Sequence, residues 1–229
     1  GGGAGIHRSA AGEVLRGQGD FVELEHYPRD DVFDSQTCSQ YYYHAHRGGE
    51  VEHGHFHTFL RPRGMPAGTR PVVLPELAIP DAPAQPHGPV VPPAPQPCQG
   101  RDNDLLSHLV AISMNEKGLP IRLFTTNRWV TGETWYPAAD TARMLDHFAL
   151  GEAGPSPLLN RWVVALIALY KPLLADLLAQ RDAAVMDWRR RRRAKVHVLE
   201  DQRLEVTSAF PIDLEAQLAQ IDAALRRVA

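Results

Sequence analysis

The sequence predicts an α+β fold in which an antiparallel sheet, built from hairpins, is covered by a long kinked helix and a C-terminal helix. Segments of alternating apolar and polar residues occur in pairs that are separated by turn residues. A long stretch carries apolar residues at three- and four-residue spacing, and strands do not alternate strictly with helices as they do in a parallel sheet. The chain has 229 residues, of which 44% are hydrophobic and 22% charged, so it can bury a core.

The sequence pattern of the N-terminal region predicts a flexible N-terminal segment, a strand and a hairpin. Residues 1–20 are glycine-rich and lack sustained periodicity, so we expect a flexible lead-in with one or two helical turns. Residues 20–28 alternate and predict a short strand, which a turn-rich segment follows. Residues 39–61 predict the clearest hairpin, because two-residue hairpin turns favour glycine and this segment contains Gly48-Gly49.

Prolines are concentrated after this hairpin. Of the 19 prolines in the chain, 12 lie between Pro62 and Pro97. Proline fixes φ and lacks a backbone donor, so residues 62–100 can form neither an interior strand nor a helix. We expect a surface excursion from a single domain over residues 21–229, and we favour an insertion loop over a docking segment.

The second half predicts two further hairpins and three helices. Residues 108–114 and 121–127 predict the second hairpin, and residues 137–150 a helix that begins at a proline. Residues 157–192 predict the long helix, which Pro172 should kink or split.

The C-terminal part predicts a third hairpin over residues 195–210. It is followed by an amphipathic helix over residues 212–228.

Charge and composition exclude several classes of protein. The net charge is −3, so we expect no general attraction to nucleic acid, and the basic run at 189–193 is interpreted as a solvated helix end. The longest uninterrupted apolar run, residues 162–170, is shorter than the roughly 20 residues of a membrane-spanning helix. We expect a cytoplasmic protein without a transmembrane segment. Two cysteines, Cys38 and Cys98, leave one disulfide open as an alternative.

Histidine is the unusual component. The chain has 11 histidines, and five of them lie in the first hairpin: His44, His46, His53, His55 and His57. Residues two apart in a strand share a face. A two-residue turn would place His44 opposite His53, whereas a four-residue loop would place His44 opposite His55 and His46 opposite His53. Both registers put all five imidazoles on one side, and the glycine pair favours the two-residue turn.

This arrangement predicts a site for a divalent transition metal. Neighbouring imidazoles about 5–7 Å apart along or across strands can converge on one ion, so three histidines would bind it and leave one position open. Imidazole suits Zn, Fe, Cu and Ni, and the sequence does not distinguish among them. Cys38 and His108 are further candidate ligands, whereas Glu52 is expected on the opposite face. Exposed histidines without a ligand, and a proton-sensing cluster, are the alternatives.

A second group of candidate residues follows the second hairpin. The run 127–136 is rich in polar and aromatic side chains on a predicted loop. Asn127, Arg128 and Trp129, together with Tyr42, could line a substrate pocket. The alternative is a structured corner whose indole rings seal the core.

Two blocks of the sequence resemble an uncharacterised bacterial family, a domain of unknown function. They are YYYHAHRGGEVEHGHFHTFLR at 41–61 and HLVAISMNEKGLPIRLFTTNRWVTGETWYPA at 108–138. The resemblance extends roughly from Gln40 to Trp188 without the proline-rich stretch. It implies a bacterial source, and it implies no activity.

Two functional hypotheses follow. The first is a metal-binding protein with a histidine-lined site on the 40–60 hairpin, acting as a metal-dependent hydrolase or oxygenase or as a metal carrier. The second is a non-enzymatic assembly subunit that binds a protein partner or another copy through the apolar helix 158–178 and the proline-rich segment. The sequence does not decide whether the protein is an enzyme.

Overall fold

The structure is a computed structural model that describes residues 10–15, 25–45, 52–72, 106–152, 154, 156–192 and 197–228. Within these residues, six strands form one antiparallel sheet in the order β1-β2-β3-β4-β5-β6, so each strand pairs with its neighbours in sequence. The strands are β1 (His26–Phe33), β2 (Ser39–Ala45), β3 (Gly54–Leu60), β4 (Ser107–Met114), β5 (Pro120–Thr126) and β6 (Val206–Pro211). The prediction of an α+β fold with an antiparallel sheet is confirmed.

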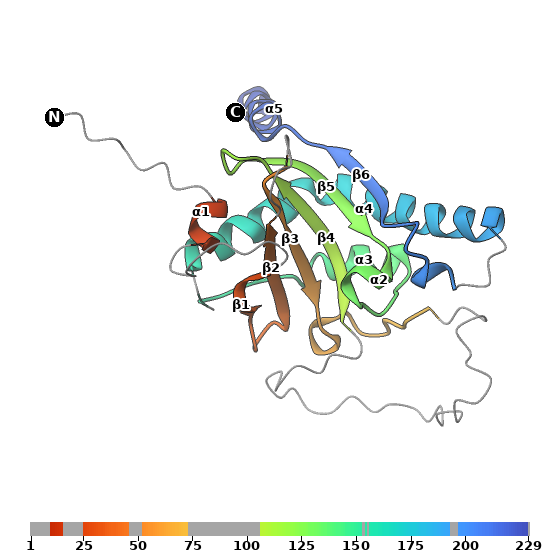
Figure 1. The fold of residues 1–229 in the computed structure, drawn as a ribbon. Helices are drawn as coiled ribbons and strands as arrows, with labels where there is room; N and C mark the ends of the chain where they lie inside the picture. Colours follow the sequence, from red (N-terminus) through yellow and green to blue (C-terminus); the bar gives the residue numbers. More distant parts are fainter. Residues whose placement is uncertain are drawn as a thin grey trace.

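The helices lie around this sheet (Figure 1). They are α1 (Ala10–Leu15), α2 (Arg128–Thr131), α3 (Ala138–Met144), α4 (Pro157–Arg192) and α5 (Leu214–Val228), with short 3-10 helices η1 (Pro62–Gly64) and η3 (Val198–Glu200). Figure 1 shows α4 crossing behind the sheet, where it packs against β5 and β6. The long helix is continuous: Pro172 lies inside it, is exposed, and does not split it.

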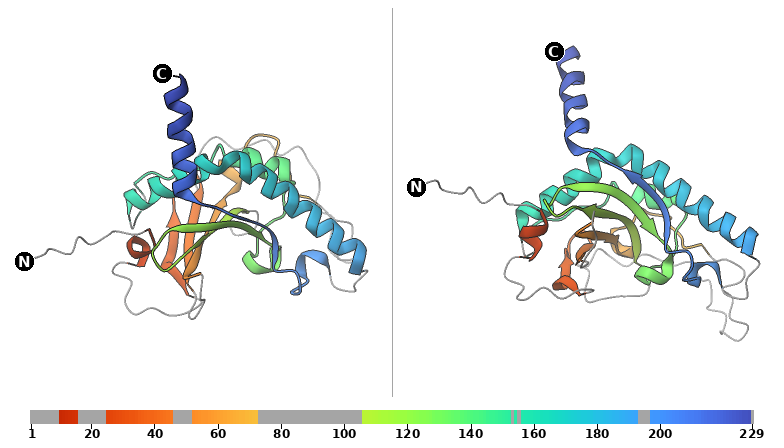
Figure 2. Two further views of the ribbon diagram at one scale, coloured as in Figure 1. Left: turned by 90° about the horizontal axis from the view of Figure 1, so that it is seen from above. Right: turned by 45° about the horizontal axis from the view of Figure 1, so that its top comes forward.

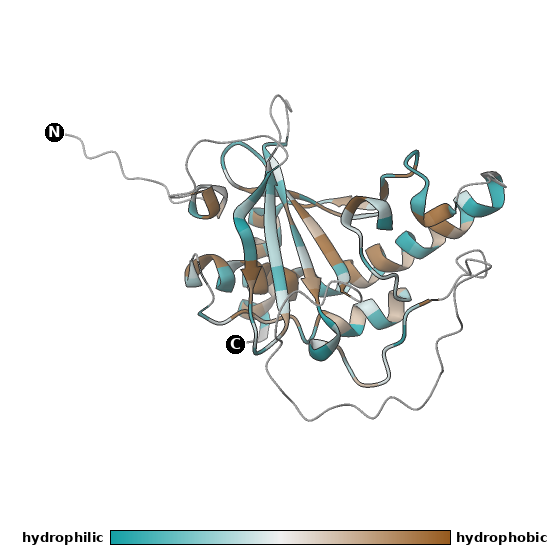
Figure 3. Ribbon diagram, turned by 60° about the horizontal axis from the view of Figure 1, so that its bottom comes forward, coloured by the Kyte–Doolittle hydropathy of each residue, from teal (hydrophilic) through white to brown (hydrophobic). Residues whose placement is uncertain are grey.

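Because strand side chains alternate, the sheet has two chemically different faces. The face that packs on α4, here called the core face, carries Tyr41, Tyr43, Phe56, Val110, Ile112 and Leu123. The opposite face, here called the histidine face, carries Tyr42, His44, His55, His57 and Phe124. Figure 3 shows that the sheet contains both hydrophilic and hydrophobic residues.

Helix α4 is held to the sheet by apolar packing and by buried hydrogen bonds, among them Ser208 Oγ to the Leu177 carbonyl at 2.8 Å. Phe56 contacts Trp162 with ring centroids 5.8 Å apart, and the Tyr41 hydroxyl donates to Asn160 Oδ1 at 2.9 Å. By length and composition alone α4 could also cross a membrane, although the sequence contains no long uninterrupted apolar run. Core helices of globular proteins meet the same criteria, and most of the apolar stripe of α4 is covered by its own chain.

Four predictions about elements need correction. The first strand is β1, which begins at His26 and includes residues 29–33 of the segment predicted as turn-rich, whereas residues 35–37 of that segment do form a turn. The third hairpin does not form, because η3 takes the place of its first strand and β6 pairs with β5 instead. The loop after the second hairpin contains the short helix α2, and the helix predicted over 137–150 ends at Met144.

Other predictions fall partly outside the described residues. Of the lead-in, the structure describes only α1, and of the proline-rich excursion only the part up to Val72. Cys98 and the Gly48-Gly49 turn also lie outside the described residues. The second hairpin is confirmed as β4 and β5, and the C-terminal helix as α5.

Candidate metal centre

Three histidines converge on the histidine face. His44 of β2 lies directly opposite His55 of β3, and His57 follows two residues later on the same face. One nitrogen from each ring lies within 4.8 Å of the others, an arrangement that could hold a metal ion. His55 and His57 are buried and His44 is half-buried, so the cluster reaches from the interior toward the surface.

The register that brings these rings together is not the one that the glycine pair favours. The observed pairs are those of a four-residue loop, with Tyr43 opposite Phe56 and His44 opposite His55. A two-residue turn would have placed Tyr43 opposite Gly54. The Tyr43 and Phe56 rings lie 4.8 Å apart on the core face, and such a cross-strand aromatic pair stabilises the observed register.

His53 does not join the cluster. It precedes the first residue of β3, so the strict alternation predicted for it does not extend that far. Its Nδ1 lies 2.7 Å from the Tyr43 hydroxyl and its ring stacks with that of Tyr43, whose side chain belongs to the core face. His46 lies outside the described residues.

The chain bends at His53, just before β3, and this bend turns Glu52 toward the histidine face, contrary to the prediction. Its Oε1 accepts a hydrogen bond from His55 Nδ1 at 2.7 Å, and its Oε2 accepts from Ser113 at 2.7 Å and from Arg122 at 2.8 Å. Burial of Glu52 opposes ionisation, but these hydrogen bonds outweigh it and lower the carboxyl pKa to about 2. An ionised carboxylate only accepts, so His55 donates from Nδ1, and Nε2 is the ring nitrogen that would bind a metal.

His57 has an equivalent partner in His108. The ring nitrogens His57 Nδ1 and His108 Nε2 lie 3.0 Å apart in the interior. Burial, and then the neighbouring histidines, lower the pKa of His57 well below its usual value, and burial lowers that of His108 to about 3. Both rings are therefore neutral, and with His57 donating from Nδ1 its Nε2 is the ring nitrogen that would bind a metal.

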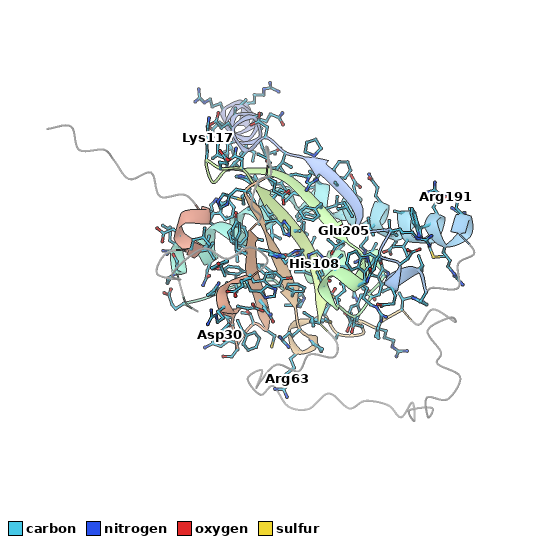
Figure 4. The ribbon with its side chains drawn as sticks, in the orientation of Figure 1. Asp30, Arg63, His108, Lys117, Arg191 and Glu205 are labelled. Atoms are coloured by element: carbon cyan, nitrogen blue, oxygen red, sulfur yellow. The ribbon has the colours of Figure 1, made fainter. Side chains whose placement is uncertain are left out.

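His108 reaches this position through a β-bulge. It was predicted to share a face with Val110 and Ile112, but the register of β3 and β4 shifts between Thr58 and Phe59 and turns His108 to the histidine face. Figure 4 shows His108 near the middle of the sheet. Because its Nε2 faces His57, it acts as a partner of a candidate ligand.

Glu133 lies behind His108 and was not predicted as part of the site. Its Oε2 accepts a hydrogen bond from the His108 backbone amide at 2.8 Å, and its Oε1 lies 4.0 Å from His108 Nδ1. Complete burial raises the pKa of Glu133 to about 8, although the nearby Arg181 guanidinium opposes this shift. A single glutamate in a polar loop gives no sequence signal that it will be buried.

At the other end of the cluster, His26 lies beside His44. The two residues are paired in the β1–β2 register, and His26 stacks on Tyr42 with ring centroids 3.6 Å apart. Its Nδ1 lies 3.0 Å from Asp31 Oδ1. Sequence reasoning missed this contact because it ended the first strand before Asp31. Burial raises the pKa of Tyr42 well above its usual value, so the hydroxyl stays protonated.

The other predicted ligands and pocket residues have contacts elsewhere. Cys38 is disulfide-bonded and offers no thiolate to a metal. The Asn127 side chain caps α2 and donates to the Val198 carbonyl at 2.9 Å. Arg128 Nε donates to Glu200 at 2.7 Å, and Trp129 donates to the Leu204 carbonyl at 2.8 Å. These three residues join α2 to the segment around η3, as in the structured-corner alternative.

The fold and the cluster define an α+β protein with a buried row of imidazoles on one face of an antiparallel sheet. The chain belongs to a family described as a domain of unknown function (DUF6969), whose sequence model matches residues 4–212. The resemblance to an uncharacterised family is thereby confirmed. No curated protein and no solved structure matches the chain.

Proposed function

We propose that this protein binds a divalent transition metal ion through His44, His55 and His57 and leaves one coordination position for water or a substrate. The observation that carries the proposal is the convergence of the three rings within 4.8 Å. Three protein ligands with an open fourth position are typical of catalytic metal sites, whereas structural sites are closed.

The partners of the rings support the proposal. Metal-binding histidines usually donate their second ring N–H to a carboxylate or another acceptor, which fixes the tautomer and the ring orientation. Here His55 donates to Glu52, and His57 has His108 as its partner. These contacts orient two of the three rings.

The ligand set favours zinc among the four candidate ions. Fe(II) oxygenases typically use two histidines and a carboxylate, whereas three neutral imidazoles suit catalytic zinc. Within the described residues, the nearest carboxylate to the cluster is Glu52, which is engaged by His55, Ser113 and Arg122. Zinc at such a site supplies a Lewis acid that activates bound water, so we favour a metal-dependent hydrolase over an oxygenase or a carrier.

Helix α4 is a poor candidate for the alternative function. Of its apolar stripe, Leu159, Val163, Leu166, Tyr170, Leu174, Leu177 and Leu178 are buried in the core. An exposed leucine remains at its start, Leu158. Docking of a partner through these buried residues would therefore require the core to open.

The test is metal content and metal uptake of the purified protein. Elemental analysis of protein prepared without chelators, followed by calorimetric titration of the metal-free form with Zn, Cu, Fe(II) and Ni, identifies the ion. We expect about one zinc ion per chain, lost in His44→Ala.

The matched control is His53→Ala, which removes a neighbouring histidine that lies outside the cluster. This variant should keep the metal. Absence of uptake by the wild-type protein, or equal losses in the two variants, would contradict the proposal.

A further inference from the structure

Helix α5 projects away from the rest of the molecule (Figure 2). It begins directly after β6, and its last anchors to the body are the Ile212 amide, which donates to the Ile121 carbonyl at 2.9 Å, and the packing of Leu214 on the core. The family model matches only residues 4–212, so α5 lies beyond the part of the chain that defines the family.

One side of this projecting helix carries an apolar stripe. Leu214, Leu218, Ile221 and Leu225 are spaced by four, three and four residues, which is the seam pattern of a coiled coil. Leu218 is 49% exposed and Leu225 is 63% exposed. A solitary helix of 15 residues is marginally stable in water, so packing of this stripe against another surface would stabilise it.

The charges along α5 indicate what that partner is. The helix begins with Asp213 and Glu215, and it ends with Arg226 and Arg227. In a parallel pair of α5 helices the two acidic ends would lie at one end of the pair and the two basic ends at the other, so like charges would be gathered at each end. In an antiparallel pair the acidic end of one helix lies beside the basic end of the other. The two helix dipoles then point in opposite directions, which is also favourable.

We propose that α5 of one chain pairs antiparallel with α5 of a second copy of this chain. Centring the pair between Leu218 and Ile221 places Leu218 of each copy opposite Ile221 of the other. The same register places Leu214 opposite Leu225 and brings Glu215 of one copy to the same side of the seam as Arg226 of the other. The two bodies then lie at opposite ends of the helix pair, so they do not collide.

A membrane surface fits α5 less well. Helices that lie on anionic membranes carry an excess of lysine and arginine on the polar face. In α5, Arg226 and Arg227 are balanced by Glu215 and Asp222. The described charges therefore favour a helix of complementary charge pattern, which a second α5 supplies.

The test is the solution mass of the full chain by sedimentation velocity over a range of concentrations. We expect twice the 25.4 kDa of one chain at high concentration. Leu218→Glu/Leu225→Glu should sediment as a single chain. The matched control Ala216→Glu/Ala223→Glu adds the same charge to exposed positions on the opposite side of the helix and should remain a dimer.

Circular dichroism melts show whether these variants keep the fold, which is expected because all four positions are exposed. A wild-type chain that stays single, or dimers that survive in Leu218→Glu/Leu225→Glu, would overturn the proposal. Flotation of a single-chain wild type with anionic vesicles would overturn it in favour of a membrane surface.

The orientation has its own test. A mixture of Leu218→Cys and Ile221→Cys proteins should form a disulfide-linked dimer on mild oxidation, because these positions face each other in the antiparallel register. Efficient cross-linking of Leu218→Cys alone, without cross-linking of the mixture beyond that level, indicates a parallel pair and would overturn the antiparallel arrangement.

Discussion

The two faces of the sheet are made by the same strands and differ in what their side chains do. On the core face Tyr43 and Phe56 pack against each other and toward α4, and burial of their apolar area stabilises the fold. One residue along each strand, His44 and His55 face the other way and meet polar groups. The chain thus combines a conventional core with a layer of buried imidazoles in one sheet.

The two faces differ in what burial of their side chains contributes to stability. Buried polar groups cost free energy unless each is hydrogen-bonded, and apolar side chains in the same places would avoid that cost. On the histidine face this chain buries His57 and His108 together with the ionisable Glu133. We infer that these groups are kept for the chemistry of the site.

The largest expected effect is on the core face. Phe56→Ala should lower the free energy of unfolding by about 3–5 kcal/mol, because a fully buried aromatic ring is lost and a cavity remains. Urea denaturation measures this loss. The comparison variant on the other face is His44→Ala, which should change the stability of the metal-free protein by about 1 kcal/mol or less. Equal losses in both variants would erase the proposed division between the faces.

A second prediction concerns the buried carboxyl group behind the cluster. The pKa of Glu133 is about 8 in the folded chain, above the usual value of 4.5. The unfolded chain therefore releases this proton at lower pH than the folded chain does, and the contribution of Glu133 to stability falls as pH rises from about 4.5 to about 8. Relative to Glu133→Gln, the wild type should lose on the order of a few kcal/mol over this interval.

Urea denaturation of both proteins at several pH values checks this prediction. Above pH 8 the difference between them should level off. If the two stability profiles run parallel from pH 4.5 to 8, Glu133 is not the buried neutral acid described above.

A third, smaller effect concerns the partner of His55. Glu52→Gln keeps the size of the side chain and removes the charge that fixes the His55 tautomer. Metal affinity should fall by about 10–100-fold, as is usual when the partner of a metal-binding histidine is lost. Calorimetric titration measures the affinity, with Glu215→Gln on α5 as a control that removes one exposed carboxylate. Unchanged affinity in Glu52→Gln would remove the support that Glu52 gives to the proposed site.

The smallest expected effect concerns a histidine outside the cluster. His53→Ala removes the hydrogen bond to the Tyr43 hydroxyl and should lower stability by about 1 kcal/mol. Chemical denaturation measures this change, and the metal content should stay that of the wild type. Loss of metal would extend the binding site to the bend before β3.

Periodicity in the sequence was sufficient to predict the helices and strands whose residues follow a regular pattern. The pair β4 and β5, the long helix α4 and the helix α5 follow from alternation or from three- and four-residue spacing. Those patterns fail where the backbone is irregular. β1 contains a bulge between Tyr27 and Val32, which interrupts the alternation that locates a strand.

The candidate site was predicted only in part, because some of its residues lie in regular strands and others lie where the backbone is irregular. His44, His55 and His57 lie in regular strand and share a face as expected. Glu52 and His53 precede β3 at a bend, so their orientations were the reverse of those predicted. His108 was assigned to the wrong face because its orientation depends on a bulge that the sequence does not reveal.

The most direct test of the central claim is a crystal structure of the zinc-loaded protein with diffraction recorded on both sides of the zinc absorption edge. We expect one strong anomalous peak on the histidine face, about 2.0–2.1 Å from one nitrogen each of His44, His55 and His57. A zinc-loaded crystal without a peak among these three rings, or with its metal at His53 or His26 instead, would contradict the account.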